Sequence, residues 1–386
     1  MQAMKQTSFY IYFTLLLAVA VTITSYHGNK MDNHSTPEKI LHRLIEDHKT
    51  PSVQYVIFNS DRILYSYTYG LADISNNRPA NAQTSYHGFS VTKTFTALAI
   101  LQLAADKKLN IDDPVSKYLP DFIYGNQISI KNLLTHSSGI PNPIPLNWIH
   151  HAKDSQKFDR TLFREQVIQK NNKTRFPPNE KFSYSNIGYM ILGNLIEVVS
   201  GQPYEDYLRE HILDKLHPGE LDFQIHNPAA HARGYHKRWS FSNAFLGFFI
   251  DKSQFMDRPE GQWKPFNHFY INDPAYGGII GSTNGFVAYL QELMRDGGTL
   301  ISEEYKQQLF TENVLSDGSP SGMCMSWFTG NLNGQRYFTH AGGGGGYYIE
   351  LRLYPDMDTG SIVIFNRSGM SDERFLDKVD KYFINS

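Results

Sequence analysis

Segments typical of β-strands lie at both ends of the chain, and the long middle of the sequence has few of them. Near the start, residues 53–58 and 63–69 are rich in β-branched and aromatic side chains and are separated by a polar turn, which predicts a β-hairpin. Near the end, strand-like segments occupy 335–340, 347–354 and 361–366. This distribution predicts an α+β fold, in which an antiparallel sheet is flanked by helices and interrupted by an inserted, mostly helical subdomain.

Helical patterns flank and separate these strands. The sequence at 35–38 supplies an N-cap, a proline near the first helical position and a capping-box glutamate, so a helix is expected to follow. A pattern over about 91–106 is apolar on most faces, which predicts a buried, central helix. Short helical patterns and loops rich in Pro, Asn and His fill the predicted insertion at about 110–275, and further helices are expected at about 283–295 and 372–383.

The N-terminus has the pattern of a secretory signal. Lys5 precedes an apolar run at 9–23, which is short for a membrane span of about 20 residues, and Ala-Val-Ala at 18–20 offers the small residues that a signal peptidase needs. Residues 1–26 are therefore predicted to be a signal peptide or an uncleaved signal anchor. The protein is expected to be exported, periplasmic or extracellular, with membrane contact only through this segment if it is uncleaved.

The composition excludes several classes of function. The chain of 386 residues carries 36 Lys and Arg against 38 Asp and Glu, a net charge of −2, and it has no marked basic patch, so nucleic acid is not expected as a partner. Its 41% hydrophobic and 19% charged residues exclude disorder of the whole chain. A single cysteine, Cys324, rules out an internal disulfide and a multi-cysteine zinc site. We expect no metal and no cofactor.

A Ser-x-x-Lys motif, Ser90 to Lys93, starts the predicted central helix, whereas no Gly-x-Ser-x-Gly motif occurs in the chain. Residues three apart share a helix face, so the hydroxyl and the ammonium would lie together in the first turn. Burial lowers the pKa of a lysine, which can then take a proton from the serine, and the helix N-terminus favours developing negative charge. The structural alternative is an N-cap serine beside a lysine whose ammonium reaches solvent.

Two further motifs carry groups that can move or hold protons. Tyr184 and Asn186 lie in a predicted loop ahead of a helical run, although a second Tyr-x-Asn at 270–272 shows how easily such a triplet occurs. His340 begins a His-Ala-Gly triplet that leads into a run of five glycines and a predicted strand. A second His-x-Gly triplet, His-Pro-Gly at 217–219, is typical of the end of a helix.

Taken in order, these three motifs resemble those of the serine β-lactamase and penicillin-binding protein family. The resemblance is to the branch that holds class C β-lactamases, D-alanyl-D-alanine carboxypeptidases, D-aminopeptidases and related esterases. It extends to flanking segments at 133–141, 176–179 and 277–282. It implies a β-lactamase/transpeptidase-like fold, and because the first and third motifs must share one site, it makes residues 35–386 a single serine hydrolase domain.

The resemblance also implies a role for each motif residue. Ser90 would attack an amide or ester carbonyl and form an acyl-enzyme. Tyr184, with its pKa lowered by Lys93, would exchange protons with the serine, the leaving group and the hydrolytic water. Asn186 would hold the lysine or the substrate amide by hydrogen bonds. His340 would contact a substrate carboxylate or tune the tyrosine.

The glycine run would complete an oxyanion hole. The implied donors to the oxyanion are the backbone N–H groups of Ser90 and Gly343. Glycine at 342–346, with Gly342 as the last residue of the third motif, would let a substrate approach the strand and pair with its edge. The structural alternative for this run is a flexible loop.

The third motif departs from the Lys-Thr-Gly of the family. His340 replaces a fixed positive charge by a titrating imidazole, and Ala341 lacks a hydroxyl that would grip a carboxylate, so strong β-lactamase activity is not expected. The sequence predicts a serine hydrolase acting on a small-molecule or peptide substrate, first a D-Ala-D-Ala carboxypeptidase or D-peptidase for which a peptidoglycan stem peptide is one candidate. A carboxylesterase, a weak class C-like β-lactamase and a non-catalytic penicillin-binding-like receptor or scaffold are the alternatives.

An aromatic cluster in the insertion allows two interpretations. It either forms part of the core or lines an apolar acyl pocket, which would favour an ester or lipid-like substrate. Its members are Trp239, Phe241, Phe245, Phe248, Phe249, Phe255, Trp263, Phe266 and Phe269.

Overall fold

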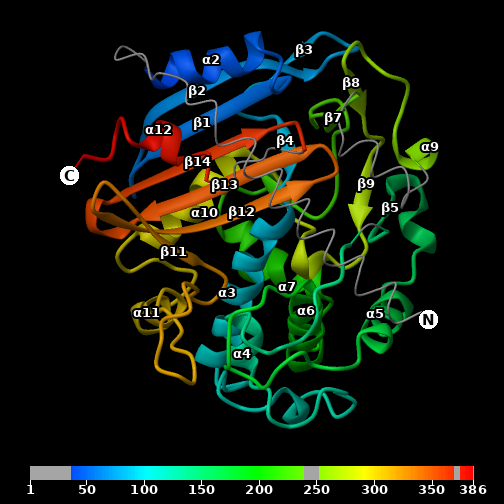
Figure 1. The fold of residues 1–386 in the computed structure, drawn as a ribbon, viewed down its shortest axis with the longest axis vertical. Helices are drawn as coiled ribbons and strands as arrows, with labels where there is room; N and C mark the ends of the chain where they lie inside the picture. The colour runs from blue at the N-terminus through cyan, green and yellow to red at the C-terminus, as the bar shows by residue number, and fades with distance from the viewer. Residues whose placement is uncertain (1–35, 146, 239–251, 369–373, 386) are drawn as a thin grey trace, which may run out of the picture. The chain divides into compact units, whose positions relative to one another are not determined.

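A computed structural model describes residues 36–145, 147–238, 252–368 and 374–385 of the chain (Figure 1). The predicted signal segment at 1–26 and the aromatic residues at 239–249 lie outside the described residues. The chain divides after Ile40 into two compact units, and the second unit, Leu41–Ser386, holds every element described below except the start of the first helix. No helix within the described ranges is long and apolar enough to cross a membrane.

The second unit is built on a seven-stranded antiparallel sheet in the order β11-β12-β13-β14-β1-β2-β3. Strand β1 pairs with β14 from Val53 opposite Phe365 to Phe58 opposite Gly360, so the two ends of the chain meet in the middle of the sheet. The predicted α+β fold with an antiparallel sheet is confirmed. The strands are β1 (Ser52–Phe58), β2 (Ile63–Asp73), β3 (Arg78–Pro79), β11 (Phe328–Leu332), β12 (Gln335–Gly344), β13 (Tyr347–Tyr354) and β14 (Thr359–Phe365).

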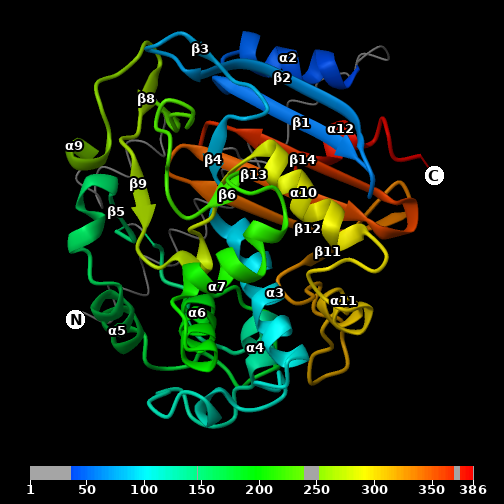
Figure 2. The same ribbon diagram turned by 180° about the vertical axis from the view of Figure 1, so that it is seen from behind.

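The two faces of the sheet are covered differently. Helix α10 (Thr283–Met294) contacts β1 and β14, and Figure 2 shows it lying across the sheet. The short helix α12 (Asp377–Asp380) lies on the other face, where Asp380 accepts hydrogen bonds from the hydroxyls of Tyr55, Tyr354 and Ser361. The predicted last helix at 372–383 is wrong in extent, because side-chain hydrogen bonds to the sheet hold this segment and turns flank its four helical residues.

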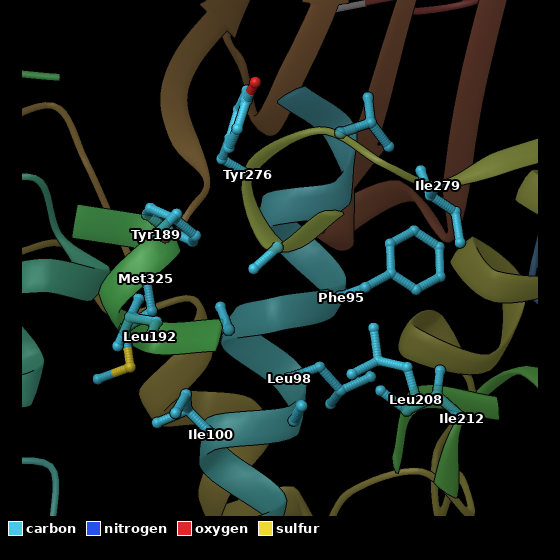
Figure 3. Close-up of a cluster of buried hydrophobic side chains, with 14 of the residues drawn as sticks. Phe95, Leu98, Ile100, Tyr189, Leu192, Leu208, Ile212, Tyr276, Ile279 and Met325 are labelled. Atoms are coloured by element: carbon cyan, nitrogen blue, oxygen red, sulfur yellow. The ribbon is translucent and has the colours of Figure 1, made fainter. Parts of the chain in front are cut away.

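Helix α3 (Thr92–Ala105) is the central buried helix, as the apolar pattern predicts. It follows the 3-10 turn η1 (Phe89–Val91) and packs against α6 (Asn186–Ser200), α7 (Tyr204–His211) and α11 (Glu303–Leu309). In Figure 3 the α3 side chains Phe95, Leu98 and Ile100 lie among apolar residues that include members of α6 and α7. Residues 92–95 at the start of α3 are fully buried, which matters because the serine motif lies at this end of the helix.

The segment between α3 and α10 contains short helices and short strands. Three small antiparallel sheets, β4-β10-β6, β5-β9 and β7-β8, connect distant loops. Their strands have only two or three residues, too few to show an alternating pattern in the sequence. These strands are β4 (Ser85–His87), β5 (Ile149–His151), β6 (Leu221–Asp222), β7 (Tyr235–Lys237), β8 (Trp263–Pro265), β9 (Phe269–Ile271) and β10 (Ile280–Ser282). The other helices are α2 (Pro37–Glu46), α4 (Ile130–Leu134), α5 (Arg160–Lys170), α9 (Lys252–Phe255), η2 (Val115–Lys117), η3 (Ala152–Lys157), η4 (Leu213–Lys215), η5 (Pro274–Tyr276) and η6 (Pro355–Met357).

Candidate functional site

Ser90 lies in a tight turn between β4 and α3. Phe89, immediately before it, has a φ of 46°, a left-handed conformation that is uncommon for an aromatic residue. The loop before β10 braces the turn, since Gly88 N–H donates to the Ile279 carbonyl over 2.8 Å and Thr92 Oγ1 accepts from Ile279 N–H over 2.9 Å. The serine side chain is partly exposed, at the N-terminal end of the helical segment, where the helix dipole favours negative charge.

Lys93 lies directly beneath this serine and is fully buried. Its ammonium donates to Ser90 Oγ over 3.1 Å and to the Tyr276 carbonyl over 2.6 Å. The Nζ atom is 5.0 Å from the ring centre of Tyr184, 5.6 Å from that of Tyr189 and 5.5 Å from that of Tyr276. Burial lowers the pKa of Lys93 well below its ordinary value of 10.5. The alternative in which the lysine ammonium reaches solvent is therefore wrong. The amine is placed to exchange a proton with the serine hydroxyl.

Tyr184 is partly exposed and lies beside the same pair, on the segment just before α6. Its ring packs against His136, with ring centres 4.2 Å apart, and lies 6.4 Å from the His340 ring. Ser185 is the N-cap of α6, where its Oγ accepts from Gly188 N–H over 3.1 Å. The structure therefore brings together the tyrosine, lysine and serine that the sequence indicated.

Asn186 departs from the expectation in two ways. It is the first residue of α6 rather than part of a loop. Its backbone N–H donates to Asn142 Oδ1 over 3.0 Å, and its buried side-chain Oδ1 has no hydrogen-bond partner among the described residues. The lysine is held by the Tyr276 carbonyl, and no bond from Lys93 to Asn186 occurs in the described part of the chain. Contact with a substrate amide remains a prediction for Asn186.

The third motif lies in β12, next to the serine turn. The β11 pairing ends at Phe328 opposite Thr339, while the next five residues, through Gly344, pair only with β13 in the described sheet. A Cβ at Gly342 would be 2.2 Å from the Gly88 carbonyl oxygen and 2.9 Å from Ser90 N, so only glycine fits there. Gly343 is exposed, and a Cβ there would have only ordinary contacts of 3.6 Å or more. The flexible-loop alternative is wrong for 342–344, which are strand. The oxyanion role of the Ser90 and Gly343 amides remains a prediction.

His340 is buried and neutral. Its Nδ1–H donates to the Ser326 carbonyl, which leaves Nε2 as a buried lone pair without a partner among the described residues. Burial, together with the charge of Lys93, lowers the pKa of His340 to about 3. At neutral pH this position therefore carries no positive charge, in contrast to the lysine of a Lys-Thr-Gly motif.

Ser90, Tyr184, His340, Gly342 and Gly343 border one cavity of about 930 Å³, whereas Lys93 and Asn186 are not among its lining residues. Aromatic rings form much of its wall, and Arg374 is the one cationic side chain among its lining residues in the described part of the chain. The lining comprises Ser90, Phe182, Tyr184, Ser321, Gly322, Phe328, Thr329, Thr339, His340, Ala341, Gly342, Gly343, Gly344, Tyr347, Tyr348, Ser368 and Arg374.

Several of these residues carried no motif in the sequence. Phe328 lies on the short strand β11, and Arg374 follows the last strand, more than 280 residues from Ser90, so only the fold brings them to the site. The acyl-pocket interpretation of the aromatic cluster does not hold for its described members. Phe255, Trp263, Phe266 and Phe269 do not line the cavity, and Phe269 instead stacks on His87 with ring centres 4.5 Å apart.

No group of three or more His, Cys, Asp or Glu side chains is placed to hold a metal ion within the described ranges. Cys324 is buried, donates through Sγ–H to the Phe310 carbonyl over 3.2 Å, and has its pKa raised to about 12 by burial. A protonated thiol of this kind is a poor nucleophile or metal ligand.

Comparisons with known proteins agree with this geometry. The family model described as "Beta-lactamase" matches residues 37–381. "Protein flp" of Staphylococcus aureus (strain N315) is 25% identical over 366 residues, which are 92% of this chain and 67% of that protein. "Penicillin-binding protein 4*" of Bacillus subtilis (strain 168) is 27% identical over 312 residues, which are 79% of this chain and 66% of that protein.

Solved structures show the same fold. The octameric penicillin-binding protein homologue from Pyrococcus abyssi has a TM-score of 0.69 and 25% identity, over 86% of this chain and 73% of that one. The D-amino acid amidase from Ochrobactrum anthropi SV3, in complex with L-phenylalanine, has a TM-score of 0.68 and 18% identity, over 88% of this chain and 93% of that one. The similarity to the penicillin-binding protein homologue includes the sequence, whereas the similarity to the D-amino acid amidase is in fold alone.

Proposed function

The chain belongs to the beta-lactamase family, and from this premise we propose that it is an exported serine hydrolase that works through an acyl-enzyme on Ser90. The observation that carries the proposal is the position of Lys93. Its buried Nζ lies 3.1 Å from Ser90 Oγ beneath the ring of Tyr184, and the serine opens to the 930 Å³ cavity. Export is inferred from the signal-like segment at 1–26.

The proposed reaction follows from these positions. Burial lowers the pKa of Lys93, and in its neutral form this amine accepts the hydroxyl proton of Ser90 as Oγ bonds to the substrate carbonyl carbon. The oxyanion forms beside the helix N-terminus and the Gly343 strand, where backbone N–H groups stabilise it. The carbon–nitrogen bond then breaks as Tyr184 gives its hydroxyl proton to the leaving amine and takes up the proton that Lys93 had accepted. Water hydrolyses the acyl-enzyme by the reverse proton path.

We infer from the residues that line the cavity that the substrate carries a free carboxylate. His340 is neutral, so it cannot supply the charge that a lysine supplies in the family motif. Arg374 lines the same cavity, and a guanidinium is the side-chain group that suits two-point binding of a carboxylate. We therefore propose that the substrate is a peptide with a C-terminal D-amino acid, such as a D-Ala-D-Ala stem peptide. The fold shared with a D-amino acid amidase supports an amide substrate.

An ester substrate is the second candidate, on the strength of the aromatic lining. Phe182 and Phe328 pack edge to face with ring centres 5.8 Å apart, and Tyr347 and Tyr348 line the same cavity. Such walls favour an apolar acyl group, which an ester of a medium-length fatty acid would supply.

Two experiments test the proposal. A fluorophosphonate and a fluorescent penicillin are applied to the wild type and to Ser90→Ala, and we expect a covalent adduct only with the serine present. Absence of a Ser90-dependent adduct with both reagents would favour a non-catalytic receptor or scaffold.

The second experiment identifies the substrate class. It measures hydrolysis of a D-Ala-D-Ala peptide, p-nitrophenyl esters and nitrocefin by the wild type and by Arg374→Met. We expect Arg374→Met to raise KM for the peptide and to leave that for the esters unchanged. Predominant ester turnover that does not depend on Arg374 would assign the enzyme as an esterase.

A further inference from the structure

His136 occupies an unusual place at the end of α4. The helix closes with Ser137 N–H donating to the Asn132 carbonyl over 2.9 Å and His136 N–H donating to the Leu133 carbonyl over 3.2 Å, and His136 itself has a φ of 54°. This helix ending favours glycine at the left-handed position, because any Cβ there is strained. A buried histidine at such a position needs a reason that lies in its side chain.

The side chain and carbonyl of His136 hold both chain neighbours of Tyr184. The His136 carbonyl accepts from Ser183 N–H over 2.8 Å, and its Nδ1 accepts from Ser185 N–H over 3.1 Å. Its ring packs on the Tyr184 ring at 4.2 Å between centres, with 34° between the planes. The tyrosine is thus fixed from both sides of its backbone and across one face of its ring.

This arrangement requires the neutral imidazole. Because Nδ1 accepts from Ser185 N–H, the ring proton is on Nε2, and a second proton on Nδ1 would oppose that N–H. The charged and titratable groups that act on the ring are Lys93 and His340, together with the rings of Tyr184 and Tyr189. Burial and the charge of Lys93 lower the pKa of His136 well below 6.5, so the accepting form persists at neutral pH.

We propose that His136 is a positioning residue, which fixes Tyr184 over Lys93 and Ser90 through the hydrogen bond from Ser185 N–H to its Nδ1. The inference rests on the proposed function, in which Tyr184 delivers a proton to the leaving group. A misplacement of about 1 Å at such a group costs about 100-fold in rate. The loss falls mainly on substrates whose leaving group needs that proton, such as an amide, and spares p-nitrophenolate, which leaves as an anion.

Two substitutions separate positioning from folding. His136→Gly suits the left-handed backbone and removes the acceptor, whereas His136→Asn tolerates this conformation and restores an oxygen acceptor near the Nδ1 position. We expect His136→Gly to lower kcat/KM for the D-Ala-D-Ala peptide by about 100-fold relative to its effect on the p-nitrophenyl ester, and His136→Asn to recover most of that loss. An equal fall for both substrates in both variants would show a merely structural role.

A double-mutant cycle tests the route through the tyrosine. In a Tyr184→Phe background, His136→Gly is expected to have no further effect on peptide turnover, because the group that it positions is gone. Full additivity would overturn the proposal. His150→Gly is the control for loss of a histidine ring elsewhere, since His150 stacks on Phe158 and bonds Asn272 outside the cavity.

A readout without turnover keeps the inference distinct from the proposed function. Hydrogen exchange of a peptide spanning 183–189 is compared in the wild type, His136→Gly and His136→Asn. Faster exchange in the glycine variant alone is expected. If the wild type fails to label at Ser90, the proposed function fails, but the exchange experiment still tests whether His136 Nδ1 fixes the segment. Equal protection in all three proteins would contradict the role of His136.

Discussion

The neutral state of His340 predicts that acid destabilises the protein through this residue. The folded imidazole has a pKa of about 3, because it is buried and faces the charge of Lys93, whereas an unfolded histidine has a value of about 6.5. The folded-state pKa is lowered, so the unfolded chain binds more protons between these two values. The stability that the neutral His340 imidazole contributes is therefore fully present above pH 6.5. This contribution is lost progressively as the pH falls from 6.5 towards 3.

The size of the effect follows from this difference. At pH 5 the unfolded imidazole is almost fully protonated and the folded one is not, so the free energy of unfolding falls by about 2 kcal/mol relative to pH 7.5. His340→Asn removes the titrating group and keeps an amide that can donate to the Ser326 carbonyl. The variant is expected to lose about 2 kcal/mol less than the wild type over the same interval.

Urea unfolding at pH 7.5 and pH 5 measures this difference. His217→Asn is the matched control, because it also removes one histidine, but from an exposed position. We expect the control to lose as much stability as the wild type and His340→Asn to lose less. Equal losses for all three proteins would refute the buried neutral imidazole, and with it the argument that the third motif supplies no charge to the substrate.

Two further substitutions test the packing around the site. Gly342→Ala places a Cβ 2.2 Å from the Gly88 carbonyl oxygen, so we expect it to slow labelling of Ser90 by a fluorophosphonate by about tenfold or more relative to the wild type. Equal rates would contradict the close approach of β12 to the turn. Leu98→Ala, at a fully buried position of α3, should lower the free energy of unfolding in urea by about 2–5 kcal/mol. Val198→Ala, at an exposed position, should lower it by about 0.5 kcal/mol or less. Similar losses in the two variants would show that α3 is not part of the core.

The sequence predicted the long strands and the central helix because their patterns extend over many residues. β1 and β13 are rich in β-branched and aromatic residues, and most residues of α3 are apolar and buried. It did not predict β11, where Gly330 and Asn331 interrupt a strand of only five residues. The same holds for the two- and three-residue strands, which exist because the surrounding fold brings distant loops together.

The site shows the same division. Ser90 and Lys93 are three residues apart on one chain segment, so helix geometry alone predicts their contact. His136 gave no such signal, since its importance depends on a left-handed helix ending and on hydrogen bonds to residues nearly 50 positions away. Arg374 likewise lies in the turn before α12, and only the fold brings it to the cavity. Contacts of this kind are set by tertiary structure, which local patterns do not encode.

The central claim is that Ser90 carries the acyl group during turnover. It is tested most directly by acid-quenching the enzyme during steady-state hydrolysis of a peptide or ester substrate and locating the added mass by peptide mass spectrometry. We expect the acyl mass on the peptide that contains Ser90, and no such mass in Lys93→Met, which lacks the amine 3.1 Å from Oγ. Turnover with the acyl group on another residue, or undiminished acylation in Lys93→Met, would contradict the account.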